Sequence, residues 1–250
     1  MLTHLYGLIG YPLSHSFSRR YFSEKFRREG IEGCRYELFP LENIKQFPAL
    51  LSAHPNLRGI NVTIPYKQQV MAYLDELEEG AAEVGAVNTI KVNGGRLAGY
   101  NTDVFGFEQS LLQFLEGNGA SPGGLQALIL GTGGASKAVQ YVLRKTGIGF
   151  RLVSRNKKPG QLTYLELNET LVQNCRLIVN TTPLGMSPQT ETCPEIPFQY
   201  IGPQHLLYDL VYNPEETKFM ARGIQRGAAV HNGLEMLQLQ AEKAWEIWNS

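Results

Sequence analysis

The sequence is poor in cysteine and histidine and has no long apolar run. Its 3 cysteines among 250 residues are widely spaced, with no C-x-x-C pair, which disfavours both a disulfide framework and a zinc site. The 5 histidines show no metal-ligand spacing. No apolar stretch approaches the ~18 residues of a membrane span, and the N-terminus lacks the basic and apolar regions of a secretory leader. We therefore expect a cytoplasmic protein without a metal site or a membrane partner.

The sequence also has no excess of positive or negative charge. Lys plus Arg and Asp plus Glu balance at 23 each, so nothing in the net charge favours nucleic acid or an anionic membrane as a partner. The chain has 43% hydrophobic residues, enough for one large or two small domains. It contains no internal repeat and no low-complexity tract. A soluble enzyme acting on a small molecule is the default expectation.

A glycine-rich turn follows a short apolar strand in the run QALILGTGGAS, Gln126–Ser136. A dinucleotide pyrophosphate needs close backbone approach, here at Gly131 and Gly133, followed by bare amides at a helix N-terminus. Ser136 replaces the third glycine of the usual pattern. The turn predicts a nucleotide site, and a plain strand-to-helix turn is the alternative.

The residues after this turn favour NADP over NAD. The spacing predicts a helix from Ser136 and a next strand over Phe150–Val153, which together make a βαβ unit. An NAD site has an Asp or Glu at the end of that second strand. Here the run Ser154–Lys158, SRNKK, has no carboxylate, and the guanidinium of Arg155 suits a 2′-phosphate and the adenine face. Each lysine of this run taken singly also fits an ordinary solvated loop.

The first half of the chain is too long for a leader and must be a domain of its own. Its apolar segments alternate between strand and helix patterns, which predicts a mostly parallel sheet. Two segments joined at Asn93-Gly94-Gly95 are expected to form a hairpin, because these turn residues tolerate positive φ. A helix from Asp103 to Glu116 is expected to cross to the nucleotide-binding half.

Polar side chains stand at predicted strand ends in this half. Asn61 and Thr63 share one face of a strand, and Lys67 follows at the start of a helix expected over Tyr66–Leu74. Two hydrogen-bonding side chains beside a lysine suit a polyhydroxylated ligand. A half-solvated edge strand is the alternative. Taken separately, Ser14-His15-Ser16 and Asn101-Thr102-Asp103 fit a turn and a helix N-cap.

Several motifs at compatible spacings run nearly end to end and resemble the shikimate dehydrogenase family. In chain order they are LIGYPLSHSFS (Leu8–Ser18), GINVTIPYK (Gly59–Lys67), GAVNTI (Gly85–Ile90), GYNTD (Gly99–Asp103), LGTGGASKA (Leu130–Ala138), NTTPLGM (Asn180–Met186), DLVYNP (Asp209–Pro214) and NGLEMLQLQ (Asn232–Gln240).

The resemblance implies an α/β protein of two domains with a cleft between them. Residues 1–102 plus 232–250 would form a substrate-binding catalytic domain with a mostly parallel sheet, and residues 103–231 a Rossmann-like NADP-binding domain. It implies the reversible NADPH-dependent reduction of 3-dehydroshikimate to shikimate, a step of chorismate and aromatic amino acid biosynthesis. The substrate partner is a small molecule, and the chain is expected to be a monomer or a homodimer.

The resemblance also assigns residues. Lys67 and Asp103 would be the catalytic pair, and hydride arriving at a ketone builds an alkoxide that a nearby ammonium stabilises and protonates. The substrate carboxylate would be bound by Ser14, Ser16 and Tyr212, and the ring hydroxyls by Asn61, Thr63, Asn88, Asp103 and Gln240, with Lys67 also touching substrate. The NADP contacts would come from Gly131, Thr132, Gly133, Gly134, Ala135, Ser154, Arg155, Asn156, Lys157, Thr181, Met186, Leu210 and Gly233.

The chain departs from the family pattern at a few positions. The NADP loop commonly reads N-R-T-x-x-R, whereas Ser154, Asn156 and Pro159 stand at three of those places, so 2′-phosphate recognition would rely on Arg155 and the lysines that follow it. Asn232 stands where an Asp often precedes the last glycine, and Tyr100 where Asp or His is frequent.

Two other functions fit the same motifs. A quinate/shikimate dehydrogenase would have a Thr for the second serine of S-x-S and an acid after the second nucleotide-domain strand, and this chain has neither. A non-catalytic NADP-binding regulator would not need a proton donor, whereas Lys67 and Asp103 are both present.

Overall fold

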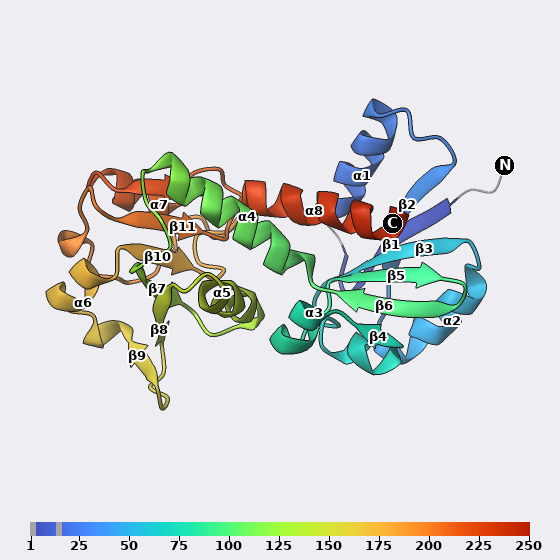
Figure 1. Cartoon of the computed structure of the whole chain (residues 1–250), viewed down its shortest axis with the longest axis horizontal. Helices are drawn as coiled ribbons and strands as arrows, with labels where there is room; N and C mark the ends of the chain where they lie inside the picture. The colour runs from blue at the N-terminus through green and yellow to red at the C-terminus, as the bar shows by residue number, and fades with distance from the viewer. Residues whose placement is uncertain (1–3, 14–16) are drawn as a thin grey trace. The chain divides into compact units, whose positions relative to one another are not determined.

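The computed structural model describes residues 4–13 and 17–250, and the chain divides into two compact units (Figure 1). Unit 1 comprises Met1–Thr102 and Ala241–Ser250, and unit 2 comprises Asp103–Gln240. The second boundary therefore falls at Ala241 and not at Asn232 as the sequence suggested. The reason is a continuous helix, α8 (Leu234–Asn249), whose first turns pack against α4 (Thr102–Gly117) of unit 2.

Unit 1 is built on one mixed sheet. Its elements in chain order are β1 (His4–Gly10), α1 (Phe17–Arg28), β2 (Cys34–Pro40), η1 (Ile44–Gln46), α2 (Phe47–Ala53), β3 (Leu57–Val62), η2 (Gln69–Tyr73), β4 (Glu76–Leu77), α3 (Glu79–Val84), β5 (Thr89–Asn93) and β6 (Arg96–Tyr100).

The strands of unit 1 lie in the order β2-β1-β3-β5-β6-β4. The pairs β1/β2, β1/β3 and β4/β6 are parallel, and β3/β5 and β5/β6 are antiparallel. The expected hairpin is confirmed: Asn93 pairs with Arg96, and the two glycines between them have φ of 58° and 86°, which two-residue hairpin turns require.

Each face of this sheet is covered by its own apolar cluster. On one face, Tyr6, Phe22 and Tyr36 pack with Ala241 and Trp248, so the last turns of α8 close the core beside α1. The other face buries residues such as Ile60 and Val70 under α2 and η2. Gly59 is needed for this packing, because a Cβ there would lie 2.4 Å from the Trp248 ring.

The helix expected over Tyr66–Leu74 does not form as an α-helix. The Lys67 carbonyl accepts from the Val87 amide at 2.7 Å, the Met71 amide donates to the Gln68 carbonyl at 3.3 Å, and the chain continues as the 3₁₀-helix η2. Lys67 therefore lies in a turn before η2 and not at the start of an α-helix. Ile64, two residues beyond the end of β3 at Val62, is 75% exposed.

Unit 2 is a parallel sheet with helices between its strands. Its elements in chain order are α4 (Thr102–Gly117), β7 (Gln126–Leu130), α5 (Gly134–Lys145), β8 (Gly149–Ser154), β9 (Gln161–Thr163), η3 (Tyr164–Glu166), α6 (Glu169–Asn174), β10 (Leu177–Asn180), η4 (Phe198–Tyr200), β11 (Leu206–Asp209), α7 (Lys218–Ile224), β12 (Ala229–His231) and α8.

The strand order of unit 2 is β12-β11-β10-β7-β8-β9, and every pair is parallel. The chain runs outward from β7 to β9, returns to β10 beside β7, and runs outward again to β12. This is the order of the doubly wound Rossmann fold, in which ligands bind at the carboxyl ends of the strands where the direction of winding reverses. In unit 2 that point lies between β7 and β10.

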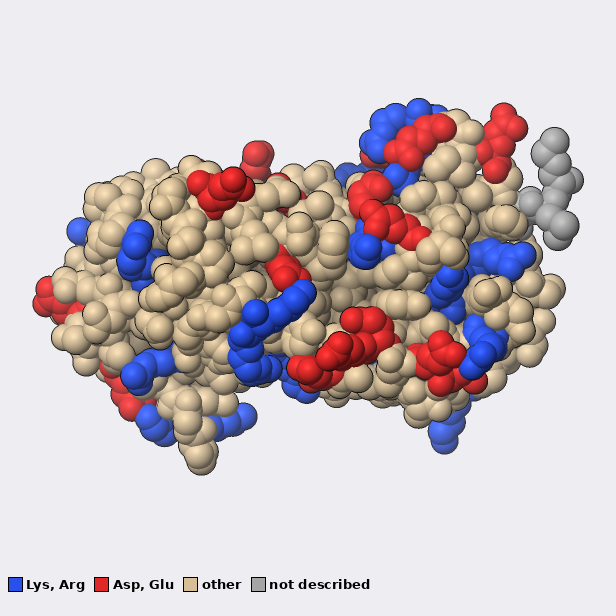
Figure 2. All heavy atoms as spheres, in the orientation of Figure 1, with Lys and Arg blue, Asp and Glu red and all other residues tan. Residues whose placement is uncertain are grey.

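Positive and negative side chains are interspersed on the face shown in Figure 2, as the balanced composition predicts. Among the described residues, no helix combines the length and the apolar character that crossing a membrane would require.

Candidate active site

The glycine-rich turn of unit 2 lies at the reversal point of the sheet. Gly131 follows β7 with φ of 103°, and a Cβ there would lie 2.9 Å from the Thr181 Oγ1 and 2.9 Å from a Thr182 methyl. The Thr181 hydroxyl donates to the Leu130 carbonyl at 2.7 Å. The ends of β7 and β10 are thus joined directly, and only glycine fits at residue 131.

The next residues leave the start of α5 open to a ligand. Gly133 is the N-cap of α5 and makes no side-chain cap, and the first turn has no acidic residue. A Cβ added at Gly133 or Gly134 would meet no protein atom within 4 Å, so protein packing does not require glycine there. Thr132 and Ala135 are exposed beside them. Uncapped amides at a helix N-terminus suit a pyrophosphate, so these residues fit a dinucleotide.

The loop after β8 holds the basic residues. Ser154 is buried, and its hydroxyl donates to the Asn156 carbonyl at 2.8 Å and accepts from the Asn156 amide at 3.2 Å. This small turn leaves Arg155 exposed at the strand end. Lys157 forms an ion pair with Glu166 at 2.5 Å, and this hydrogen bond lowers the pKa of Glu166 to about 2. Of the two cations, Arg155 is therefore the better placed to meet a phosphate.

A buried carboxylate ties together the loops that follow β10 and β11. Asp209 is fully buried and accepts from Asn180 Nδ2 at 2.9 Å, from the Val211 amide at 3.0 Å and from Thr217 Oγ1 at 2.7 Å. Burial raises its pKa to about 6 against these three hydrogen bonds, which lower it. Asn180 in turn accepts from the amide and hydroxyl of Thr182.

The remaining nicotinamide-side residues come from these loops. Leu210 and Gly233 touch, since a Cβ at Gly233 would lie 2.2 Å from the Leu210 carbonyl oxygen. Met186 and Tyr212 are 46% and 38% exposed, which leaves both side chains accessible to a ligand. Asn232 donates to the Glu215 carbonyl at 2.9 Å and accepts from the Leu234 amide at 3.0 Å. An aspartate could not make the first bond, which explains this departure from the family pattern.

In unit 1, two of the candidate hydroxyl-binding residues, Asn61 and Asn88, share one buried hydrogen-bond network. Asn61 Nδ2 donates to the Asn88 carbonyl at 3.3 Å and to Thr89 Oγ1 at 3.2 Å. The side-chain oxygen of Asn88 accepts from the Thr102 amide at 2.7 Å and from the Thr89 hydroxyl at 3.1 Å. The side-chain oxygen of Asn88 is thus occupied by hydrogen bonds within the protein. Its side-chain NH₂ group is therefore the part that suits a substrate hydroxyl.

Lys67 and Thr63 follow β3 in the same unit and are both half-buried. The Thr63 amide donates to the Ile9 carbonyl at 2.9 Å, and the Lys67 carbonyl accepts from Val87. These bonds fix the backbone that carries the two side chains. Ser14 and Ser16, the expected carboxylate ligands, lie outside the described residues.

Asp103 and Gln240 belong to unit 2 and come from helices in contact with each other. Asp103 lies in the first turn of α4, and Gly106, one turn later, approaches α8 so closely that a Cβ would lie 2.5 Å from the Met236 carbonyl and 3.1 Å from the Gln240 Cβ. Gly106 was not expected as a site residue from the sequence. Its signal, a lone glycine inside an amphipathic helix, marks a close helix contact.

Two further residues escaped the sequence-based expectations, Tyr36 and Asp209. Tyr36 donates to Asn61 Oδ1 at 2.8 Å, and Asp209 holds the loops described above. Both are buried polar groups on strands, a combination that only the fold identifies. Among the described residues, no group of three His, Cys, Asp or Glu side chains could hold a metal ion.

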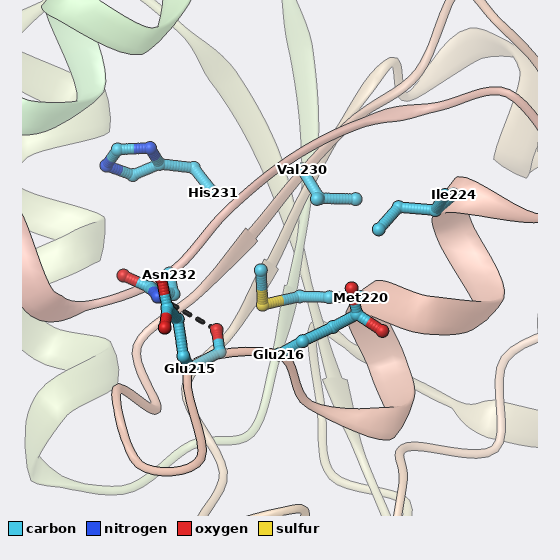
Figure 3. A pocket seen from close by; sticks show the side chains of 7 residues that line it. All are labelled: Glu215, Glu216, Met220, Ile224, Val230, His231 and Asn232. Atoms are coloured by element: carbon cyan, nitrogen blue, oxygen red, sulfur yellow. Dashed lines mark hydrogen bonds between the residues drawn. The ribbon is translucent and has the colours of Figure 1, made fainter.

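A hollow on unit 2 is lined by none of the candidate ligand-binding residues. Figure 3 shows its side chains, which project from the loop before α7, from α7 itself and from the region of β12. Two of them are carboxylates that would repel a phosphate. Its lining is Glu215, Glu216, Met220, Ile224, Val230, His231 and Asn232.

Comparison with known proteins identifies the family of this chain. The family model described as "Shikimate dehydrogenase substrate binding domain" matches residues 8–90. The shikimate dehydrogenase (NADP(+)) of Halothermothrix orenii is 41% identical, with 98% of this chain and 91% of that protein aligned.

Solved structures give the same result. The crystal structure of shikimate dehydrogenase from Aquifex aeolicus has a TM-score of 0.85 and 33% identity, covering 99% of this chain and 92% of that one. The Thermus thermophilus shikimate 5-dehydrogenase in complex with NADP(H) and shikimate has a TM-score of 0.83 and 30% identity, covering 98% and 93%. With this degree of identity over nearly the whole length, the chain belongs to the shikimate dehydrogenase family.

Proposed function

We propose that this protein is an NADP-dependent shikimate dehydrogenase that interconverts 3-dehydroshikimate and shikimate. The observation that carries the proposal is that both parts of such an enzyme are present in one chain. Unit 2 has a Rossmann sheet with the Gly131 turn at the point where the winding reverses. Unit 1 has the residues expected to bind substrate, which are Asn61, Thr63, Lys67 and Asn88. Relatives of this family carry the same activity in their names. On this proposal unit 1 binds substrate and unit 2 binds NADP.

The cofactor residues follow from unit 2. The amides at the start of α5 would bind the pyrophosphate, and Arg155 would bind the 2′-phosphate. The exposed Lys157 forms an ion pair with Glu166 and would contribute less. Thr181, Met186, Leu210 and Gly233 would surround the nicotinamide. When bound, the nicotinamide supplies or accepts the hydride.

The protein's own part in the chemistry is to bind, orient and exchange a proton. The ring hydroxyls would meet Asn61, Thr63, Asn88 and Gln240, and Ser14, Ser16 and Tyr212 would bind the carboxylate. Lys67 would give a proton to the substrate oxygen in the reduction and take it back in the oxidation. Asp103 would orient both the ammonium and the reacting hydroxyl.

One assay tests the activity. Absorbance of the reduced nicotinamide is followed with purified protein, shikimate and NADP⁺, and in parallel with quinate and with NAD⁺. Shikimate with NADP⁺ should give the highest kcat/KM. Equal use of quinate would indicate the quinate/shikimate enzyme, and NADP⁺ binding without turnover of either substrate would indicate a regulator.

Substitution of Arg155 should weaken NADP⁺ selectively. A hydrogen bond between a guanidinium and a phosphate contributes about 1.5–3 kcal/mol, so Arg155→Ala should raise the KM for NADP⁺ roughly ten- to a hundredfold and leave the KM for NAD⁺ almost unchanged. Lys158→Ala, in the same exposed loop, is the matched control and should have a smaller effect. If Arg155→Ala keeps the wild-type preference for NADP⁺, the assignment of the phosphate to Arg155 is wrong.

We also propose that the protein is cytoplasmic and a monomer or a homodimer, the states expected from its composition and from the family. Size-exclusion chromatography with light scattering measures the second of these directly.

A further inference from the structure

Tyr36 is a buried polar residue that none of the roles above uses. It lies in β2 opposite Tyr6 of β1, is 6% exposed, and stacks on Phe22 of α1 with ring centroids 4.7 Å apart. Burial raises the pKa of its hydroxyl far above the usual range. The phenol is therefore protonated wherever the protein is folded and always has one proton to donate.

That proton fixes the orientation of Asn61. The Asn61 amide nitrogen must face the Asn88 carbonyl, 3.3 Å away, because a backbone carbonyl can only accept. The Asn61 oxygen then faces Tyr36, which donates to it at 2.8 Å. A carbonyl oxygen accepts two hydrogen bonds, so Oδ1 can take a substrate hydroxyl beside Tyr36. The Asn61 amide is held by three hydrogen bonds, two from its nitrogen and one to its oxygen, and without the phenol the oxygen loses its bond.

Tyr36 also extends the network to α1. The Ser18 side chain hydrogen-bonds the same phenol, and Ser18 is the second residue of α1, two residues along the chain from Ser16. Hydrogen bonds thus run without a break from Ser18 through Tyr36 and Asn61 to Thr89 and Asn88. Two of the residues expected to bind ring hydroxyls, Asn61 and Asn88, are thus connected to this one phenol.

We propose that Tyr36 is a positioning residue for substrate binding, which holds the Asn61 amide in the orientation that receives a ring hydroxyl. The proposal rests on the proposed function. Tyr36 would act through Asn61 and would not touch the substrate or the reacting atoms. Its loss should therefore weaken shikimate binding and leave the chemical step nearly intact.

The test is Tyr36→Phe, which keeps the ring stacked on Phe22 and removes the hydroxyl alone. We expect the KM and the calorimetric Kd for shikimate to rise roughly three- to tenfold, with kcat and the KM for NADP⁺ changed by less than about twofold. Tyr6→Phe is the matched control, since Tyr6 lies on the same face, is 1% exposed, and bonds Asn249 at 3.5 Å. It should leave the KM for shikimate unchanged.

A double-mutant cycle separates positioning from a general loss of stability. If Tyr36 acts through Asn61, then Tyr36→Phe should have no further effect on the KM for shikimate in an Asn61→Ala background. The same rise in both backgrounds, a rise of equal size in Tyr6→Phe, or an unchanged KM in Tyr36→Phe would each overturn the proposal. The wild-type assay reports separately on the proposed function: no oxidation of shikimate there would overturn the function and this role together.

Discussion

Replacing Lys67 by alanine is expected to lower kcat for shikimate oxidation about 10²- to 10⁴-fold, the range typical of general acid–base catalysis. The ammonium would both stabilise the charge on the substrate oxygen and exchange its proton. Shikimate should still bind, since Asn61 and Asn88 would still meet its ring hydroxyls. Steady-state kcat together with calorimetric binding of shikimate to the variant measures both parts.

Three further variants sharpen this result. Lys67→Met, similar in length and uncharged, should be as slow as Lys67→Ala, whereas Lys45→Ala, an exposed lysine of η1, should keep wild-type kcat. Asp103→Asn should change kcat and KM together, because Asp103 would also touch a ring hydroxyl. A near-normal kcat in Lys67→Ala with only KM raised would show that the lysine binds substrate without acting on the proton.

The second large effect concerns Asp209 and protein stability. The pKa of this buried carboxyl is raised from 3.8 to about 6 in the folded protein, so between these pH values the folded state binds more protons than the unfolded state. The free energy of unfolding therefore falls as pH rises from about 4 to about 6, by about 3 kcal/mol for this group. Above pH 6 the whole of that loss is present.

Asp209→Asn should recover this free energy. The asparagine oxygen can accept from Asn180 and Val211, and its NH₂ group can donate to Thr217 Oγ1, so all three contacts remain without the buried charge. We expect the variant to be about as stable as the wild type at pH 4 and about 1–3 kcal/mol more stable at pH 7. Urea unfolding at a series of pH values, wild type against variant, gives the difference directly.

Asp209→Leu separates the charge from the hydrogen bonds. It leaves the Asn180, Val211 and Thr217 donors without their acceptor, and each buried donor without a partner costs about 1–3 kcal/mol. This variant should be less stable than the wild type by at least about 3 kcal/mol at pH 4, and the difference should be smaller at pH 7, where the wild type has itself lost about 3 kcal/mol by burying the charge. If Asp209→Asn is instead less stable than the wild type at pH 7, the ionised carboxylate contributes more through its contacts than burial costs it.

Local pattern accounts for the parts of the fold that were predicted well. The run from β7 through α5 to β8 was predicted because an apolar strand, a glycine turn and an amphipathic helix are each visible in a short window. The hairpin between β5 and β6 was predicted from its turn for the same reason. The helix expected after Tyr66 is instead the 3₁₀-helix η2, and just before it the Lys67 carbonyl accepts from a distant amide, that of Val87.

The candidate site was also predicted only in part. Its residue types could be identified from motifs, but their contacts could not. The ion pair of Lys157 with Glu166 depends on β9 pairing beside β8, and the bond of Asn232 to the Glu215 carbonyl depends on the loop before α7. Both contacts change what the side chain can offer a ligand, and neither leaves a periodic signal in the sequence.

The sequence alone determined the family, the Rossmann-like half and the residue types available for NADP and substrate, because these depend on short motifs and their order along the chain. The tertiary structure decided that α8 belongs in part to each unit, that Tyr36 orients Asn61, and that Asp209 is buried among three donors. The physical reason is that hydrogen-bond partners and burial are set by which strands become neighbours. In both sheets, neighbours such as β1 and β3 or β7 and β10 are far apart in the chain.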